Sequence, residues 1–138
     1  MKKFLNIGFS VLLLGWVATS CNDDDENYQT IKAVEKIKID SVSIPKDTMQ
    51  VLGVQAIKTF STYGSMCEGF YGYDYVNGEN LTRTVTSYKY ITDGTCGTNN
   101  HVASGQINFS PQEAGTYTFR FWAGGENWIT RTIIVKSL

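Results

Sequence analysis

The sequence predicts an all-β domain built as an antiparallel sandwich or barrel. Residues 30–138 lack the apolar spacing that marks an amphipathic helix, and they are rich in Thr, Val, Ile, Tyr and Phe. Short runs of alternating apolar and polar residues are separated by glycines, and the whole chain contains only two prolines, Pro45 and Pro111. Short alternating strands joined by turn residues are typical of these two architectures.

The first predicted strand, 33–44, changes phase along its length. Ile37 and Ile39 share one face, whereas Val42 and Ile44 share the other. Because successive side chains of a strand point to opposite faces, this flip predicts either a bulge near residue 40 or a strand that passes from one sheet to the other.

The remaining strands follow from the same alternation. Asn77-Gly78 is a hairpin turn signal, and Gly124-Gly125 separates the two halves of a closing hairpin. The stretch 92–105 is polar and is predicted to be a loop. Strands are expected at 50–60, 69–76, 81–91, 106–109, 116–123 and 127–136.

One motif narrows the fold class. Glu113, Gly115, Tyr117 and Phe119 follow one another at alternate positions. This spacing resembles the corner between strands E and F of immunoglobulin-like domains, where a Tyr hydroxyl bonds the corner backbone and its ring packs inward. Phe119 stands where antibody domains have a cysteine, so their inter-sheet disulfide is absent. The resemblance implies an immunoglobulin-like antiparallel β-sandwich and carries no information on activity.

The first twenty residues have the three parts of a secretory signal peptide. Lys2 and Lys3 are followed by an apolar run of 14 residues, 4–17, and then by Ala18-Thr19-Ser20. A membrane-spanning helix needs about 20 apolar residues, so we expect cleavage rather than a retained anchor. Residues 18–21 resemble a bacterial lipobox, with Ala18 where that family usually has Leu. The resemblance implies that Cys21 carries acyl chains, and two or more such chains hold a protein firmly on a membrane.

An acidic run follows the predicted lipid attachment site. Residues 23–26 are four consecutive carboxylates, whose mutual repulsion favours an extended, solvated spacer. Their position resembles the surface-export signal of Bacteroidota lipoproteins, which implies an outer-membrane protein facing outward. We therefore expect residues 21–31 to form the lipidated cysteine and tether, and residues 32–138 to form the single domain. Adjacent carboxylates lack the alternating ligand spacing of a calcium loop.

Composition limits the partners and the covalent links of the mature chain. Without residues 1–20, ten basic and thirteen acidic side chains remain, so the net charge is −3 and nucleic acid is not an expected partner. Cys67 and Cys96 form an even pair in an exported chain, which predicts a disulfide. A zinc site would need more ligands than these two and His101, the single histidine. The other alternative, a Cys-His nucleophile, would leave free thiols outside the cell.

The closing hairpin carries the main binding candidate. If the alternate aromatic residues from 117 to 121 point inward, Arg120 and Trp122 point outward, and a symmetric turn places Trp122 opposite Trp128 and Arg120 opposite Thr130. Two outward indoles beside an arginine would form a platform for sugar rings or a peptide. Because Trp is usually largely buried, we favour the alternative in which one or both indoles cover the end of the core.

The aromatic strand 69–76 allows two phases. Tyr71, Tyr73 and Tyr75 share one face, and Gly72 and Asp74 share the other, together with Phe70. An unpaired buried Asp74 would be costly. We therefore expect the three tyrosines in the core and Asp74 in solvent.

The sequence contains no recognisable catalytic pattern. His101 is expected alone in a polar loop, and no nucleophile motif or phosphate-binding loop occurs. A glycosidase needs two convergent carboxylates, but Glu68, Asp74, Glu79 and Asp93 are scattered singly. We expect no enzyme activity, no cofactor and no metal.

Two functional hypotheses follow. The first is a membrane-anchored, non-catalytic module that binds a glycan or a partner protein at the cell surface. The alternative is a structural or inhibitory lipoprotein that contacts a protein partner through its loops, chiefly 92–105.

Overall fold

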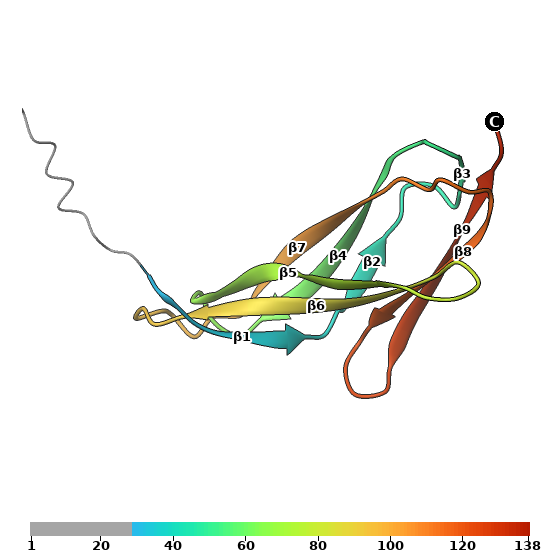
Figure 1. Ribbon diagram of the computed structural model, residues 1–138. Helices are drawn as coiled ribbons and strands as arrows, with labels where there is room; N and C mark the ends of the chain where they lie inside the picture. Colours follow the sequence, from blue (N-terminus) through green and yellow to red (C-terminus); the bar gives the residue numbers. More distant parts are fainter. Residues whose placement is uncertain (1–28) are drawn as a thin grey trace, which may run out of the picture.

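The protein is described here by a computed structural model that covers residues 29–138. This part of the chain forms nine strands and no helix, so it holds no helix able to span a membrane. A six-stranded and a three-stranded sheet pack against one another (Figure 1), which confirms the all-β sandwich. The strands are β1 (Ile31–Ile37), β2 (Ser41–Ser43), β3 (Thr48–Gln50), β4 (Gln55–Tyr63), β5 (Glu68–Asn77), β6 (Thr82–Thr92), β7 (His101–Phe109), β8 (Gly115–Trp122) and β9 (Trp128–Lys136).

Strand β6 organises the larger sheet. One of its edges pairs with β5; the other is shared by β8, which runs parallel to residues 82–85, and β1, which runs antiparallel to residues 87–92. The sheet continues from β8 to β9 and ends at β3, which is parallel to β9. The larger sheet is therefore mixed instead of antiparallel as predicted, whereas the smaller sheet, β2-β4-β7, is antiparallel throughout.

The phase change near residue 40 marks a passage between the sheets, one of the two outcomes that the sequence predicted. The predicted strand 33–44 consists of β1 in the larger sheet and β2 in the smaller. Between them, Ile39 is 1% exposed and its N–H donates to the carbonyl of Trp122 at 3.0 Å. The next N–H, of Asp40, donates to the carbonyl of Phe60 at 2.8 Å. The crossing residues thus satisfy their backbone donors in both sheets.

Three other predicted boundaries differ from the structure. The predicted strand 50–60 is split into β3 and β4 at Leu52, whose φ is 63°. The predicted loop 92–105 is shorter, because β7 already begins at His101. The domain begins before residue 32, because β1 starts at Ile31 and the Thr30 carbonyl accepts a hydrogen bond from the Asp93 N–H at 3.2 Å.

The core lies between the two sheets and centres on β8. Tyr117, Phe119 and Phe121 are buried, and Phe119 meets Phe109 of the smaller sheet edge to face at 5.0 Å between ring centroids. Aromatic pairs of this geometry contribute beyond the area they bury. The other fully buried core residues are Ile39, Ile57, Val85, Ile133 and Val135.

The corner before β8 has the geometry that the motif predicted. The Tyr117 hydroxyl donates to the Glu113 carbonyl at 3.0 Å while its ring packs against Phe109. Gly115 has a φ of +149°, and a Cβ at that position would collide with the Leu81 side chain. The corner thus needs a glycine and a hydroxyl, and both are present.

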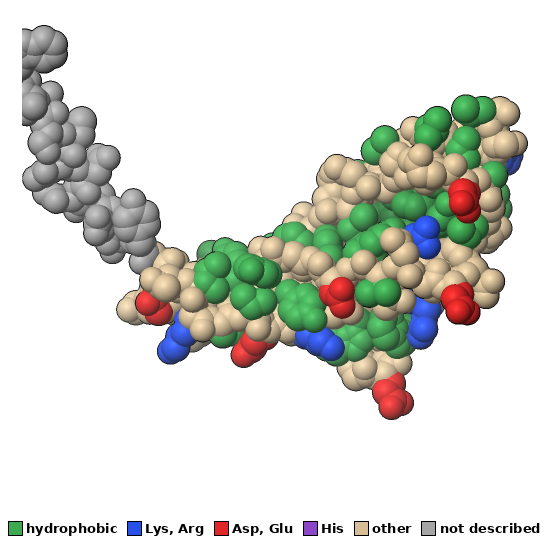
Figure 2. All heavy atoms as spheres, in the orientation of Figure 1, with side chains coloured by type: hydrophobic (Ala, Val, Ile, Leu, Met, Phe, Trp, Pro, Cys, Tyr) green, Lys and Arg blue, Asp and Glu red, His purple; other side chains and the backbone are tan. Residues whose placement is uncertain are grey.

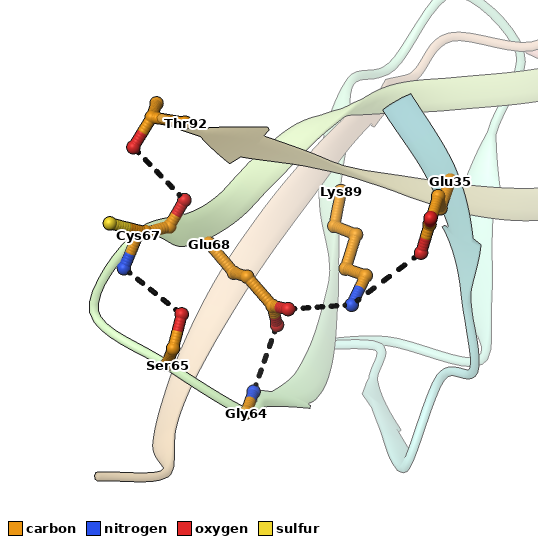
Figure 3. Close-up of polar contacts among 7 residues, drawn as sticks. All are labelled: Glu35, Gly64, Ser65, Cys67, Glu68, Lys89 and Thr92. Carbon is orange, nitrogen blue, oxygen red and sulfur yellow. Dashed lines mark hydrogen bonds and ion pairs between the residues drawn. The ribbon is translucent and has the colours of Figure 1, made fainter. Parts of the chain in front are cut away.

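The predicted disulfide joins Cys67 to Cys96, with Cα atoms 5.4 Å apart. It ties the start of β5 to the loop that precedes β7. Figure 3 shows two hydrogen bonds beside it: the Thr92 hydroxyl donates to the Cys67 carbonyl at 3.3 Å, and the Cys67 N–H donates to Ser65 Oγ at 3.2 Å. The Thr92 N–H donates to the same Cys67 carbonyl at 2.9 Å.

Tyr117→Phe should lower the free energy of unfolding by about 1 kcal/mol, because it removes the corner hydrogen bond and leaves the ring packing. Urea unfolding of the chain from residue 21 onward, carrying Cys21→Ser, measures the difference. Tyr71→Phe is the control, since Tyr71 is 56% exposed. Equal stability of the Tyr117 variant and the parent would show that the corner bond adds nothing.

Removing the disulfide with Cys67→Ala/Cys96→Ala should lower the free energy of unfolding by roughly 3–4 kcal/mol, because the bridge restricts the unfolded chain across a separation of 29 residues. Urea unfolding with and without dithiothreitol checks this. The reductant should destabilise the parent and leave the double variant unchanged. A parent insensitive to reduction would argue against a stabilising bridge.

Candidate functional site

The closing hairpin has the register that the symmetric turn predicted. Trp122 lies opposite Trp128, and Arg120 lies opposite Thr130. Because the residues on either side of Arg120 are fully buried, Arg120 and Trp122 point away from the core, onto the outer face of the larger sheet. Gly124 and Gly125 form the turn with positive φ values of 96° and 56°.

Both indoles lie on this outer face, so the expectation that one or both would cover the core is wrong. Each is half-buried, and neither packs against the core cluster. The carbonyl of Trp122 bonds Ile39 on the side away from β9. The pair Trp122–Trp128 is therefore not bonded through its backbone, and side chains of such pairs approach most closely.

Polar contacts fix the two rings. The Trp122 Nε1–H donates to the Gly125 carbonyl at 2.9 Å. The Arg120 guanidinium lies 4.7 Å from the Trp128 ring centroid, and the Lys36 ammonium lies 5.9 Å from that of Trp122. Both are cation–π distances. We call Lys36, Arg120, Trp122 and Trp128 the tryptophan platform.

The exposed aromatic surface continues across β1 onto β6 and β5. Lys36 lies opposite Tyr88 on β6. Tyr88 in turn lines a shallow hollow of about 340 Å³ with Val34, Tyr71 and Asp74. Gly72 forms its floor, and a Cβ there would meet open space. Figure 2 shows hydrophobic side chains over β1, β5 and β6, interspersed with charged ones.

In the aromatic strand 69–76, the prediction of which side chains face the core is correct only at the end farther from the disulfide. Tyr73 and Tyr75 pack against the core and Asp74 is exposed, as expected. A bulge between Phe70 and Gly72 reverses the order nearer the disulfide. There Phe70 packs inward on Tyr73, with ring centroids 4.7 Å apart, and Tyr71 is exposed instead of buried.

A polar cluster occupies the disulfide end of the sandwich (Figure 3). The Lys89 ammonium lies 2.9 Å from Glu68 and 3.9 Å from Glu35, which joins β6 to β5 and β1. Partial burial tends to raise the pKa of Glu68. Hydrogen bonds from Lys89 and the Gly64 N–H outweigh that effect and hold this pKa below its usual value. The cluster thus stabilises the charged form of Glu68.

His101 is part of the same end but lies in a strand instead of the expected loop. It lies opposite Tyr63 in the β4–β7 ladder, and the two rings stack at 5.2 Å. Its buried Nδ1 has no hydrogen-bond partner within residues 29–138. The disulfide removes both thiols, so no Cys-His pair exists among the described residues.

The four scattered acidic residues do not converge. Glu68 is engaged with Lys89, and Asp93 accepts a hydrogen bond from the Thr30 N–H at 3.1 Å. Asp74 lies on the outer face and Glu79 in the exposed turn after β5. In the described range no three Cys, His, Asp or Glu side chains are grouped as metal ligands.

The predicted signal peptide, Cys21 and the acidic run lie outside the described residues. No family model, curated protein or solved structure matches the chain. The sequence pointed to Arg120, Trp122 and Trp128 but missed Lys36 and Tyr88. Alternation along β1 predicts that Lys36 and Ile37 point to opposite faces of the strand. No local signal predicts that β1 lies next to β8, where Lys36 reaches Trp122.

Glu68→Gln should reduce the amount by which the free energy of unfolding falls between pH 7 and pH 3. Because the pKa of Glu68 is lowered in the folded state, its charged form stabilises the fold above the unfolded pKa of about 4.5, and that contribution is lost as the pH falls through the folded pKa. Urea unfolding between pH 7 and pH 3 measures the loss. The parent should lose more stability than the variant over this range. The exposed Glu79→Gln is the control and should follow the parent; identical limbs for all three would exclude the Glu68 ion pair as a source of acid sensitivity.

Proposed function

We propose that this chain is a cell-surface lipoprotein whose sandwich is a non-catalytic module that binds a glycan at the tryptophan platform. The observation that carries the proposal is the pair of outward indoles, Trp122 and Trp128, each with a cation over its ring. Neither indole contributes to the core, so folding alone does not account for them.

The chemistry of the platform suits a sugar ring. The C–H groups on one face of a pyranose pack on an aromatic face and release water from apolar area. Arg120 and Lys36, each over one ring, carry N–H donors that can bond the hydroxyls of a sugar stacked on the rest of the aromatic surface. The Trp122 ring is already held by Gly125 and each ring contacts a cation, so little side-chain entropy is lost on binding.

The anchoring part of the proposal rests on the N-terminal sequence. The signal peptide, Cys21 at its end and the acidic run after it support an acylated protein on the outward face of a bacterial outer membrane. The membrane is thus the proposed partner of the N-terminus, and the glycan that of the platform.

A partner protein is the competing occupant of the platform. Flat aromatic surfaces with arginine also anchor protein interfaces. The neighbouring hollow, which Val34, Tyr71 and Tyr88 help to line, is open to solvent and is not an enclosed socket for a side chain. That surface shape suits a sugar ring that lies flat on it better than a side chain that protrudes from a partner protein.

Trp122→Ala and Trp128→Ala should each weaken glycan binding roughly 5- to 150-fold, since each removes a stacking face worth about 1–3 kcal/mol. The parent is first screened on an array of bacterial, plant and host glycans, and affinities are then measured by titration. Trp122 and Trp128 are the two tryptophans left after the signal peptide, so their fluorescence reports binding directly. Ile134→Ala, which changes an exposed outer-face residue of β9, is the control. Glycan binding that survives both tryptophan substitutions would remove the platform from the proposal, and a parent that binds no glycan would leave the protein partner.

A further inference from the structure

A second cavity opens between the sheets at the end of β5 that is opposite the disulfide. It has a volume of about 510 Å³, within the range of small-ligand sites. Residues from β5, β6, β7 and the tyrosine corner line it. It lies on the inner side of the larger sheet, so it is separate from the tryptophan platform and does not depend on the function proposed for that surface.

Among the described residues that line this cleft, Arg83 is the only basic one and Glu113 the only acidic one. Arg83 lies opposite the buried Phe119 in the β6–β8 ladder and therefore faces inward. Its Nη1 donates to the Thr82 carbonyl at 3.0 Å, and its Cζ lies 5.0 Å from the Tyr117 ring centroid. The guanidinium is thus held over the aromatic ring of the corner, and most of its five N–H donors stay free.

The inner face of β6 shows why this arginine is unusual. Val85 and Ser87 are buried in the middle of the strand, and a cation stands at each end, Arg83 and Lys89. Lys89 is paired with two carboxylates, whereas no carboxylate lies within 4.0 Å of Arg83 in residues 29–138. A half-buried guanidinium without a counter-ion gains from an anion that enters from solvent.

The other lining groups specify more than an anion. Tyr75 and Asn77 present a hydroxyl and an amide that can donate or accept hydrogen bonds, and Glu113, which also lines the cleft, can accept from a sugar hydroxyl. Leu81 and the Tyr117 ring form apolar wall beside them. A ligand that fits combines one carboxylate, several hydroxyls and an apolar ring face on a compact frame, and a hexuronic acid has these three features.

We propose that this cleft binds a hexuronic acid residue of an acidic glycan, with its carboxylate paired to Arg83. The hydroxyls of the sugar then meet the side chains of Asn77 and Glu113, and the ring lies against Tyr117. Planar guanidinium groups bind carboxylates through two parallel hydrogen bonds, which gives the site its selectivity for the acid over the neutral sugar.

The test uses the chain from residue 21 onward with Cys21→Ser, and digalacturonate as the probe. Heteronuclear NMR should show shifts of the Arg83 side chain and of the Asn77 amide on titration. Galactobiose, the uncharged counterpart, should bind at least tenfold more weakly. Acetate and a tripeptide with a free carboxyl terminus separate the sugar acid from a bare anion and from a peptide.

Two variants and one control tie binding to the cleft. Arg83→Gln should weaken digalacturonate binding roughly 10- to 100-fold. Asn77→Asp adds a negative charge opposite Arg83 at an exposed position that the core does not need, and it should weaken binding similarly without affecting folding. Arg131→Gln is the matched control, because Arg131 also donates to the preceding carbonyl, of Thr130, but lies outside the cleft.

Each outcome decides the proposal. Loss of binding in both cleft variants with unchanged affinity in the Arg131 variant supports it. Equal binding of galactobiose, acetate or the tripeptide overturns it, as does the absence of shifts at Arg83. Because the tryptophan fluorescence is recorded in parallel, a glycan that binds the platform alone is distinguished from one that enters the cleft.

Discussion

The passage of the chain from one sheet to the other at residues 38–40 is the constraint on which the rest of the structure depends. Ile39 fills the core there, and its N–H bonds the carbonyl of Trp122 at the end of β8. This single bond joins the start of the domain to the closing hairpin, which lie far apart in sequence. Next to it, β1 and β8 follow one another along the same edge of β6, and Lys36 of β1 lies over the Trp122 ring. The crossing therefore adds Lys36 to the tryptophan platform.

The unequal size of the two sheets explains where the polar groups lie. Three strands cannot cover six, so the ends of the inner surface of β6 stay accessible to water while its middle is sealed. Charged residues at those ends keep their hydration in part and avoid the cost of full burial. Lys89 fills one end with its carboxylate partners, and Arg83 fills the other without any within the described range. The unequal size of the sheets thus leaves an ion-paired Lys89 at one end of β6 and an open cleft beside Arg83 at the other.

Features encoded locally could be predicted from the sequence, and features set by distant pairing could not. Alternation predicted the strands, and the phase flip predicted the change of sheet as one of two outcomes. The spacing from Glu113 to Tyr117 predicted the hydrogen bond of the corner. The bulge beside Phe70 arises in the pairing of β5 with β6, so no local pattern predicts it. Because of the bulge, Tyr71 is exposed to solvent instead of buried in the core.

The polar strand β7 was predicted only at its end. It lies at the edge of the smaller sheet and buries little beyond Gly105 and Phe109, so it lacks an apolar pattern. Gly105 is required there because a Cβ would collide with Phe70 and Tyr73 from the facing sheet. The parallel pairing of β6 with β8, which brings Arg83 and Tyr117 together, likewise joins segments more than thirty residues apart. No local pattern could have predicted either candidate site in full.

The direction in which the chain enters the domain relates the two sites to a membrane. Thr30 bonds Asp93 beside the disulfide, so the first described residues meet the domain at its stapled end. Under the proposed anchoring at Cys21, a pull on the tether acts on this end, where the disulfide and the Glu68–Lys89–Glu35 ion pairs oppose local opening. The Arg83 cleft opens at the other end of β5, away from the anchor, and the tryptophan platform lies along the side between them. A domain attached in this way holds its rigid end toward the membrane and presents both candidate surfaces to an extended polymer outside the cell.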